Sequence, residues 1–125
     1  VRMALFRAGL GPDDISFVNA HGTGTEANDL CEGTVLARVF GENLRYFSTK
    51  SITGHTLGAA GVLELIFTLI MLDEQRIPPN WNCAVPDPRL PVPPTLEETP
   101  FRGTFAMSTS LAFGGCNAAL IAGRS

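Results

Sequence analysis

The chain has 125 residues, of which 45% are hydrophobic and 17% are charged, and its formal net charge at pH 7 is −3. Such a composition supports one domain with a buried core and lacks the basic field that nucleic-acid binding requires, so no nucleic-acid partner is expected. Three cysteines without a Cys-x-x-Cys pair argue against a disulfide framework or a zinc site and favour a reducing, cytoplasmic location with no bound metal.

The first predicted elements are the end of a helix, a strand and a second helix. Residues 3–8 have the spacing of a helix that stops at Gly9, so the chain is expected to start inside an element, as a fragment does. Residues 15–20 are rich in β-branched and aromatic side chains, which predicts a strand ending at His21. Apolar residues then recur at helical spacing and predict a helix over residues 26–40.

A second strand and helix follow in the same order. Residues 44–48 form the strand candidate, and residues 59–74 form a helix that is apolar nearly all round and is expected to be buried on most sides. Its most apolar run, residues 62–72, is about half of the roughly 20 residues that cross a bilayer, so no membrane contact is expected. This order predicts parallel strands that gather ligands at their carboxyl ends.

The last third of the chain contains a connection and a hairpin. Eight of the nine prolines lie in residues 78–100, which predicts an extended connection over the surface. Residues 104–109 and 116–122 then form two strand candidates around a glycine-containing turn and predict an antiparallel hairpin. The fold class expected from these elements is α/β, with a mixed sheet and helices on its faces.

The only lysine and the only two histidines lie in two short boxes rich in glycine and threonine, residues 19–25 and 50–61. Imidazole exchanges protons near neutral pH, and glycine permits a close approach of backbone to a ligand. A single histidine is more often a hydrogen-bonded structural residue. Here both predicted strands end at the same edge of the sheet, so His21 and His55 are expected to share one reaction centre.

The first box also matches a loose dinucleotide-binding fingerprint, Gly22-x-Gly24-x-x-Ala27. Acidic side chains crowd the helix start where a pyrophosphate would bind, and no acid follows the next strand to hold a ribose, so this alternative is disfavoured. Asp29 and Glu32 stabilise the positive end of the helix. They also share one helix face, where they are natural partners for Lys50 if the two boxes meet.

In combination, these motifs resemble the C-terminal half of the β-ketoacyl-acyl carrier protein synthases, condensing enzymes of the thiolase-like superfamily, and the discrete synthase II type is most similar. The resemblance covers essentially the whole chain and rests on Asn19–Thr25, Asp29 with Glu32, Ser48–Ser51, Gly54–Gly61 and Phe113–Asn117. It implies that residues 1–125 form the C-terminal half of a thiolase-like fold, incomplete at its N-terminus, and that the N-terminal half is absent from this chain.

The chemistry implied by the resemblance is acyl transfer to a cysteine, decarboxylation of malonyl-carrier protein and Claisen condensation, in fatty acid or polyketide elongation. His21 and His55 would be two members of a Cys-His-His triad whose N–H groups stabilise the enolate oxygen. Lys50 would pair with Glu32 and Asp29 and hold the second box in place. None of the three cysteines stands in the motif of the nucleophile, so the chain alone is expected to be inactive.

The resemblance also implies substrate contacts and a gate. Thr23 and Thr25 would bind the phosphopantetheine arm of acyl carrier protein. Phe113 and Gly114 would belong to a gating loop that contributes to the oxyanion hole. Ala112 stands where the family has glycine, and this replacement is expected to restrict positive φ angles and thereby the movement of the gate.

The expected partners are acyl carrier protein, the N-terminal half of the same enzyme and a second subunit, in a homodimer or a heterodimer. No diffusible cofactor is implied, because the substrates arrive on phosphopantetheine. The alternative function is that of a non-catalytic partner subunit, similar to the chain-length factors that pair with polyketide ketosynthases. The two histidines argue against it, because the resemblance implies that such partners often lose active-site residues.

Overall fold

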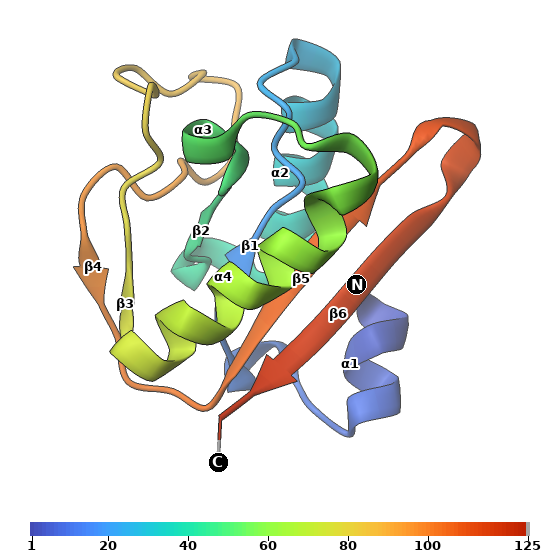
Figure 1. Cartoon of the computed structure of the whole chain (residues 1–125), viewed down its shortest axis with the longest axis vertical. Helices are drawn as coiled ribbons and strands as arrows, with labels where there is room; N and C mark the ends of the chain where they lie inside the picture. Colours follow the sequence, from blue (N-terminus) through green and yellow to red (C-terminus); the bar gives the residue numbers. More distant parts are fainter. Residues whose placement is uncertain (125) are drawn as a thin grey trace.

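A four-stranded mixed sheet forms the centre of the structure, a computed structural model that describes residues 1–124 (Figure 1). The strand order is β2-β1-β5-β6, with β1 (Ile15–Asn19), β2 (Tyr46–Phe47), β5 (Phe105–Leu111) and β6 (Asn117–Gly123). β1 runs parallel to β2 and β5, whereas β5 and β6 form an antiparallel hairpin. The expected parallel strands and closing hairpin are both confirmed.

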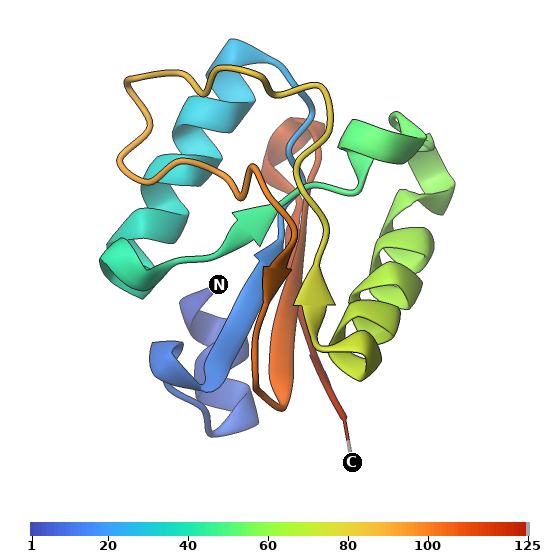
Figure 2. The same cartoon turned by 90° about the vertical axis from the view of Figure 1, so that its left-hand side faces the viewer.

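The proline-rich connection runs past the outer edge of β2 without adding a strand to it (Figure 2). It leaves from β3 (Arg76–Ile77) and returns through β4 (Thr99–Pro100), and these two strands pair with each other outside the main sheet. Proline lacks the N–H of a strand ladder, so contact with β2 is made by single residues such as Thr95, which donates to the Tyr46 carbonyl from its N–H at 2.8 Å and its hydroxyl at 2.7 Å. The predicted surface connection is confirmed, and β2 is shorter than expected.

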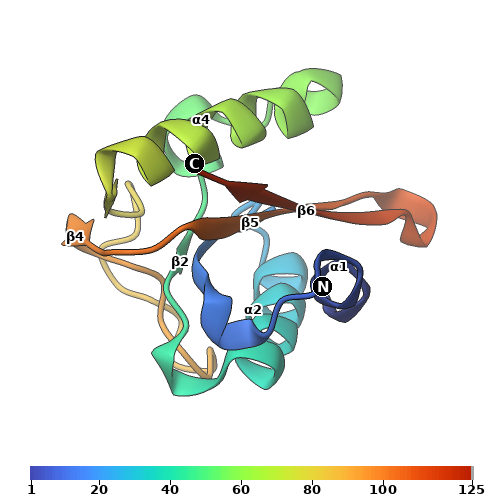
Figure 3. The ribbon, with the colours of Figure 1, turned by 90° about the horizontal axis from the view of Figure 1, so that it is seen from below.

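Helices cover both faces of the sheet (Figure 3). One face carries α1 (Arg2–Ala8) and α2 (Glu26–Phe40), and the other carries α4 (Ala60–Glu74). Successive residues of β1 point to opposite faces, so Phe17 packs in the cluster that includes Leu72 of α4. Its neighbour Val18 packs in the cluster that includes Leu36 of α2. The loops that follow β1 and β2 therefore leave a sheet that is packed on both sides.

The predicted helices begin and end close to their expected bounds. Gly9 ends α1 with a φ of 67°, and its N–H bonds to carbonyls of the last turn. α2 has the expected bounds, and α4 begins one residue late because a 3-10 turn, Leu57–Ala59, precedes it. The short helix α3 (Lys50–Thr53) inside the second box was not expected. Among residues 1–124, no helix combines the length and apolar content needed to span a membrane.

The expectation that α4 is buried on most sides is wrong for this chain. Val62, Ile66, Leu69 and Ile70 are between 41% and 65% exposed. A sheet can cover only one stripe of a helix, and the residues of α4 that face it, such as Leu72, are fully buried. The apolar residues on the other side of α4 are not covered by any part of residues 1–124.

Candidate active site

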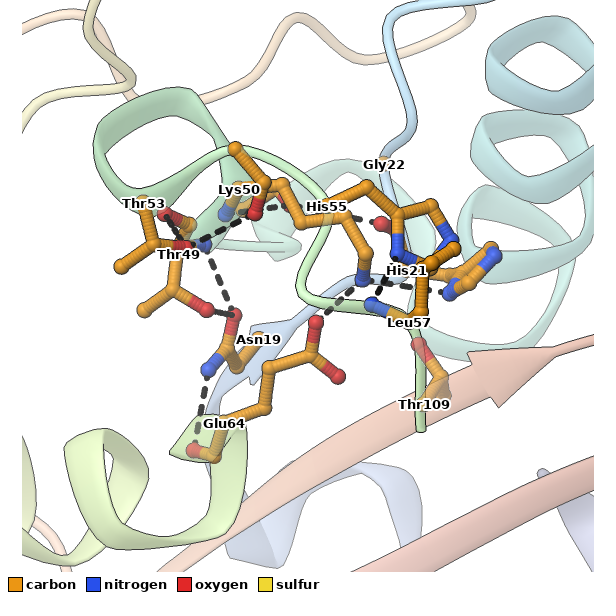
Figure 4. Close-up of polar contacts among 12 residues, drawn as sticks. Asn19, His21, Gly22, Thr49, Lys50, Thr53, His55, Leu57, Glu64 and Thr109 are labelled. Atoms are coloured by element: carbon orange, nitrogen blue, oxygen red, sulfur yellow. Dashed lines mark hydrogen bonds and ion pairs between the residues drawn. The ribbon is translucent and has the colours of Figure 1, made fainter. Parts of the chain in front are cut away.

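The two histidines meet at the edge of the sheet where β1 and β2 end. His21 follows β1, and His55 lies in the loop between α3 and α4 (Figure 4). Their ring centroids are 5.5 Å apart and the ring planes are nearly perpendicular, at 88°. His21 is buried, whereas His55 is exposed. The structure therefore brings together the two side chains that the sequence places in separate boxes.

Both rings accept a hydrogen bond at the same nitrogen. The Leu57 N–H donates to Nδ1 of His55 at 3.1 Å, and Nζ of Lys50 lies 3.2 Å from Nδ1 of His21 (Figure 4). A lysine ammonium has only donors, so Nδ1 of His21 is the acceptor in that contact. A neutral imidazole that accepts at Nδ1 carries its proton on Nε2. Each histidine therefore has an Nε2–H group available as a donor.

The backbone of Leu57 is unusual for a residue that is not glycine. Its φ is 51°, in the left-handed region that costs about 1–2 kcal/mol for a residue with a β-carbon. This conformation begins the 3-10 turn before α4, and within it the Leu57 N–H reaches the ring of His55. No pattern in the sequence indicates this bend, because Leu57 reads as an ordinary apolar residue.

The environment of His21 favours its neutral form. Burial lowers the pKa of His21 below its ordinary value, and the positive charge of Lys50 lowers this pKa further. The carboxylate of Glu32 acts in the opposite direction but does not reverse the shift. At pH 7 the ring is therefore neutral and keeps the Nε2–H tautomer that its contact with Lys50 selects.

The expected pairing of Lys50 with Glu32 and Asp29 is wrong, because Lys50 forms its ion pair with Glu64. The side chains of Lys50 and Glu64 are only 4% and 3% exposed. Glu64 comes from α4, which covers the opposite face of the sheet from α2. Asp29 accepts a hydrogen bond from Asn28 and forms no ion pair among residues 1–124.

A signal in the sequence could have identified Glu64 as the partner. It is the only charged residue in the apolar run of residues 62–72, and a buried carboxylate requires a partner of opposite charge or several donors. The chain has a single lysine. Lys50 stands in the box that leads into α4, which places it near Glu64 once α4 is packed on the sheet.

Glu32 holds the backbone of the first box instead. Its carboxylate accepts hydrogen bonds from the N–H groups of His21 and Gly22, both at 2.9 Å, and from the Thr109 hydroxyl at 2.7 Å. Gly22 has a φ of 37°, and a β-carbon there would lie 2.5 Å from that of Ser48. A pyrophosphate would need the N–H groups of this loop, but those of His21 and Gly22 already donate to Glu32. The structure therefore does not support the dinucleotide-binding alternative.

Asn19, at the start of the first box, connects the end of β2 to α4 through side-chain hydrogen bonds. It is fully buried, and its amide nitrogen donates to the Glu64 carbonyl at 3.1 Å and to the Thr68 hydroxyl at 3.2 Å. Its oxygen accepts from the N–H and the hydroxyl of Thr49, the residue before Lys50, at 3.1 and 3.2 Å. All four hydrogen-bonding positions of the amide are used, which fixes the ends of β1 and β2 against α4.

The remaining expected site residues lie around this centre. Thr23 and Thr25 are close together, with hydroxyls 2.9 Å apart, and the side chain of Phe113 is fully exposed. Ala112 has a φ of −136°, an extended conformation that any residue adopts, whereas Gly114 has a φ of 80°. The methyl group of Ala112 is therefore unstrained in this arrangement of the loop, and its effect on gating stays a prediction.

A cleft of about 600 Å³ opens beside His55. It lies between the two boxes and the proline-rich connection, and its lining includes Gly22, Thr23, Lys50, His55 and Trp81, but not His21. Arg89, in the proline-rich connection, forms an ion pair with Glu26 of α2 at 2.7 Å. Hydrogen bonds from Arg89 also lower the pKa of Asp87 to about 2. Residues 1–124 contain no cluster of three or more His, Cys, Asp or Glu side chains placed to hold a metal ion.

Two facing histidines and a buried lysine thus lie together at the edge of a mixed sheet. The family model for the β-ketoacyl synthase C-terminal domain matches residues 1–84. The chain therefore belongs to the β-ketoacyl synthase family, and the fold and family inferred from the sequence are confirmed.

Individual relatives agree with this assignment. The chain is 41% identical over 97% of its length to 3-oxoacyl-[acyl-carrier-protein] synthase 2 of Staphylococcus aureus. A β-ketoacyl synthase from Burkholderia phymatum superposes on 99% of the chain with a TM-score of 0.94 and 38% identity, and the chain covers 31% of that structure. A ketosynthase from Xenorhabdus doucetiae, solved in complex with its chain length factor, superposes on the whole chain with a TM-score of 0.92 and 41% identity. The chain covers 32% of that structure. The chain spans 31% of the length of the Staphylococcus aureus relative.

Proposed function

We propose that this chain is the C-terminal part of a 3-oxoacyl-acyl carrier protein synthase, in which His21 and His55 promote decarboxylation of a malonyl thioester. The observation that carries the proposal is that Nδ1 of each ring accepts a hydrogen bond, from Lys50 and from Leu57. Two adjacent Nε2–H groups are thereby available to one thioester oxygen. Such donors stabilise charge that develops on oxygen in the transition state, at about 3–4 kcal/mol per donor.

The proposed reaction conserves atoms and charge without a redox cofactor. The carbon–carbon bond to the malonyl carboxylate breaks and carbon dioxide leaves. The electron pair of the broken bond stays with the thioester as an enolate, whose oxygen His21 and His55 stabilise. The enolate carbon then attacks the carbonyl of an acyl-cysteine thioester, and the cysteine sulfur leaves as thiolate. This cysteine is proposed to lie in the remainder of a longer protein, because none of Cys31, Cys83 and Cys116 stands in the motif of the nucleophile.

The exposed side of α4 supports the proposal that more protein packs against this chain. Its four exposed apolar residues form a helix face of the kind that soluble proteins cover, and the chain spans only 31% of its Staphylococcus aureus relative. We assign this cover to the N-terminal part of the same enzyme. The proposed active protein is a cytoplasmic homodimer or a heterodimer, and the solved complex of a ketosynthase with its chain length factor supports the second possibility.

The cleft supports acyl carrier protein as the proposed partner. The Staphylococcus aureus relative is named for an acyl-carrier-protein substrate. In this chain, Thr23 lines the cleft and its hydroxyl lies beside that of Thr25. Hydroxyl groups at this place can hydrogen-bond the amides of a phosphopantetheine arm, whose thioester would extend toward His55.

The proposal is tested with His21→Ala and His55→Ala in the full-length protein that contains this chain. Carbon dioxide release from malonyl-acyl carrier protein is measured, and each variant is expected to lose about 100-fold or more in rate. Asn43→Ala, an exposed change beside the opposite end of β2, is the control and is expected to keep the wild-type rate. Normal release by either histidine variant contradicts its assigned role. A folded wild-type protein that never releases carbon dioxide supports the non-catalytic partner subunit instead.

A further inference from the structure

The carboxylate of Glu32 joins three segments that are distant in the sequence. It is 5% exposed, and two of its three donors are the N–H groups of His21 and Gly22. The third donor is the hydroxyl of Thr109 on β5, 77 positions further along the chain and itself only 3% exposed. No lysine or arginine among residues 1–124 forms an ion pair with Glu32. Among residues 1–124, the hydroxyl of Thr109 is therefore one of three donors to this buried carboxylate.

Thr109 occupies a place from which it can influence the first box. A buried carboxylate that loses a donor keeps an unsatisfied oxygen, and the hydrogen bonds that remain must reorganise around it. Here the remaining donors are the backbone of His21 and Gly22, so any movement of the Glu32 carboxylate is transmitted to that loop. Thr109 also lies on β5 shortly before the turn that contains Phe113 and Gly114.

We propose that Thr109 is a positioning residue for His21. Its hydroxyl anchors Glu32, and Glu32 holds the backbone of His21 and Gly22 so that the imidazole stays against Lys50 and faces His55. Through the same hydrogen bond, β5 and its turn are tied to the first box. This inference rests on the proposed function only for its effect on catalysis, because the contact itself is a property of the fold.

Thr109→Val is the direct test, because valine keeps the shape of threonine and removes only the hydroxyl. Thr104→Val is the matched control: the same change at an exposed threonine whose side chain makes no hydrogen bond to residues 1–124. Both are made in the full-length protein. Hydrogen–deuterium exchange is measured on the peptide that contains His21 and Gly22, together with kcat and KM for malonyl-acyl carrier protein decarboxylation.

Thr109→Val is expected to speed exchange of that peptide by about tenfold and to lower kcat by about tenfold, with little change in KM, since one hydrogen bond to a charged group is lost. Thr109→Ser keeps the hydroxyl and is expected to restore both values, and Thr104→Val is expected to match the wild type. Wild-type exchange and kcat in Thr109→Val overturn the proposal. A kcat loss that Thr109→Ser does not restore also overturns it.

The outcomes separate this proposal from the proposed function. If the wild-type protein shows no decarboxylation, the proposed function fails, while the exchange data still decide whether Thr109 holds the first box. If Thr109→Val does not fold, Thr109→Cys supplies the same comparison, because its thiol is a weaker donor and a smaller increase in exchange is expected. Wild-type exchange in Thr109→Cys then overturns the proposal.

Discussion

Glu64→Ala in the full-length protein tests whether the Lys50–Glu64 ion pair is as buried as the structure indicates. With side chains 4% and 3% exposed, removing the carboxylate leaves a buried ammonium whose other side-chain contact is Nδ1 of His21, 3.2 Å away. Breaking a buried pair by removing one partner costs about 3–5 kcal/mol. We therefore expect the free energy of unfolding to fall by about 4 kcal/mol.

The assay is urea-induced unfolding followed by circular dichroism, with two further variants. Glu74→Ala is the matched control, because it also removes an acid from α4 but breaks an exposed pair with Arg76, which is worth at most about 1 kcal/mol. Lys50→Met with Glu64→Leu replaces the buried pair by apolar side chains of similar size. Such replacements are often neutral or stabilising, so this double variant is expected to recover most of the loss.

The reasoning is refuted if Glu64→Ala loses no more stability than Glu74→Ala. That result would mean that Lys50 reaches water or another partner once Glu64 is gone. It is refuted equally if the double variant is as unstable as Glu64→Ala, because the loss would then come from packing and not from an unpaired charge.

Two further predictions concern the first box. Gly22→Ala is expected to lose at least about 2 kcal/mol of stability, because its β-carbon would lie 2.5 Å from that of Ser48. The control is Gly24→Ala, whose β-carbon would meet no atom within 4 Å and which is expected to lose only about 1–2 kcal/mol for its positive φ. Equal urea midpoints for the two variants contradict this prediction. The lowered pKa of His21 means that the unfolded chain binds a proton more readily than the folded one. Its contribution to stability is therefore complete above the ordinary pKa of about 6.5 and is lost as the pH falls through the folded pKa. An NMR titration of the His21 ring checks this, and a midpoint at or above about 6.5 contradicts it.

Local patterns in the sequence predicted the helices and strands well, because spacing and stop signals act over a few residues. The bounds of α2 follow from its apolar spacing and from Gly41, which ends it. The short length of β2 could not be predicted in this way. Its two residues, Tyr46 and Phe47, are those that pair with β1, and pairing between strands that are distant in the sequence leaves no local pattern.

The residues of the site were predictable from the sequence, but most of the contacts between them were not. His21, His55 and Lys50 stand out because the chain has no other histidine or lysine. The partner of Lys50 depends on which face of the sheet each helix covers, and the sequence does not state that Glu64 and Glu32 approach from opposite faces. The role of Thr109 was missed for the same reason, because strand β5 meets the first box only in the folded sheet.

The two acids divide the work of fixing His21 between its backbone and its ring. Glu32, from α2, binds the N–H of His21, and Glu64, from α4, holds the Lys50 ammonium that contacts Nδ1 of the ring. Because α2 and α4 cover opposite faces of the sheet, the two restraints reach His21 from opposite sides. Asn19, two residues before His21, supports the second restraint, since it bonds to the backbone of both Thr49 and Glu64. A donor that is held in this way needs little reorganisation when charge develops beside it, which is the condition for electrostatic stabilisation of a transition state.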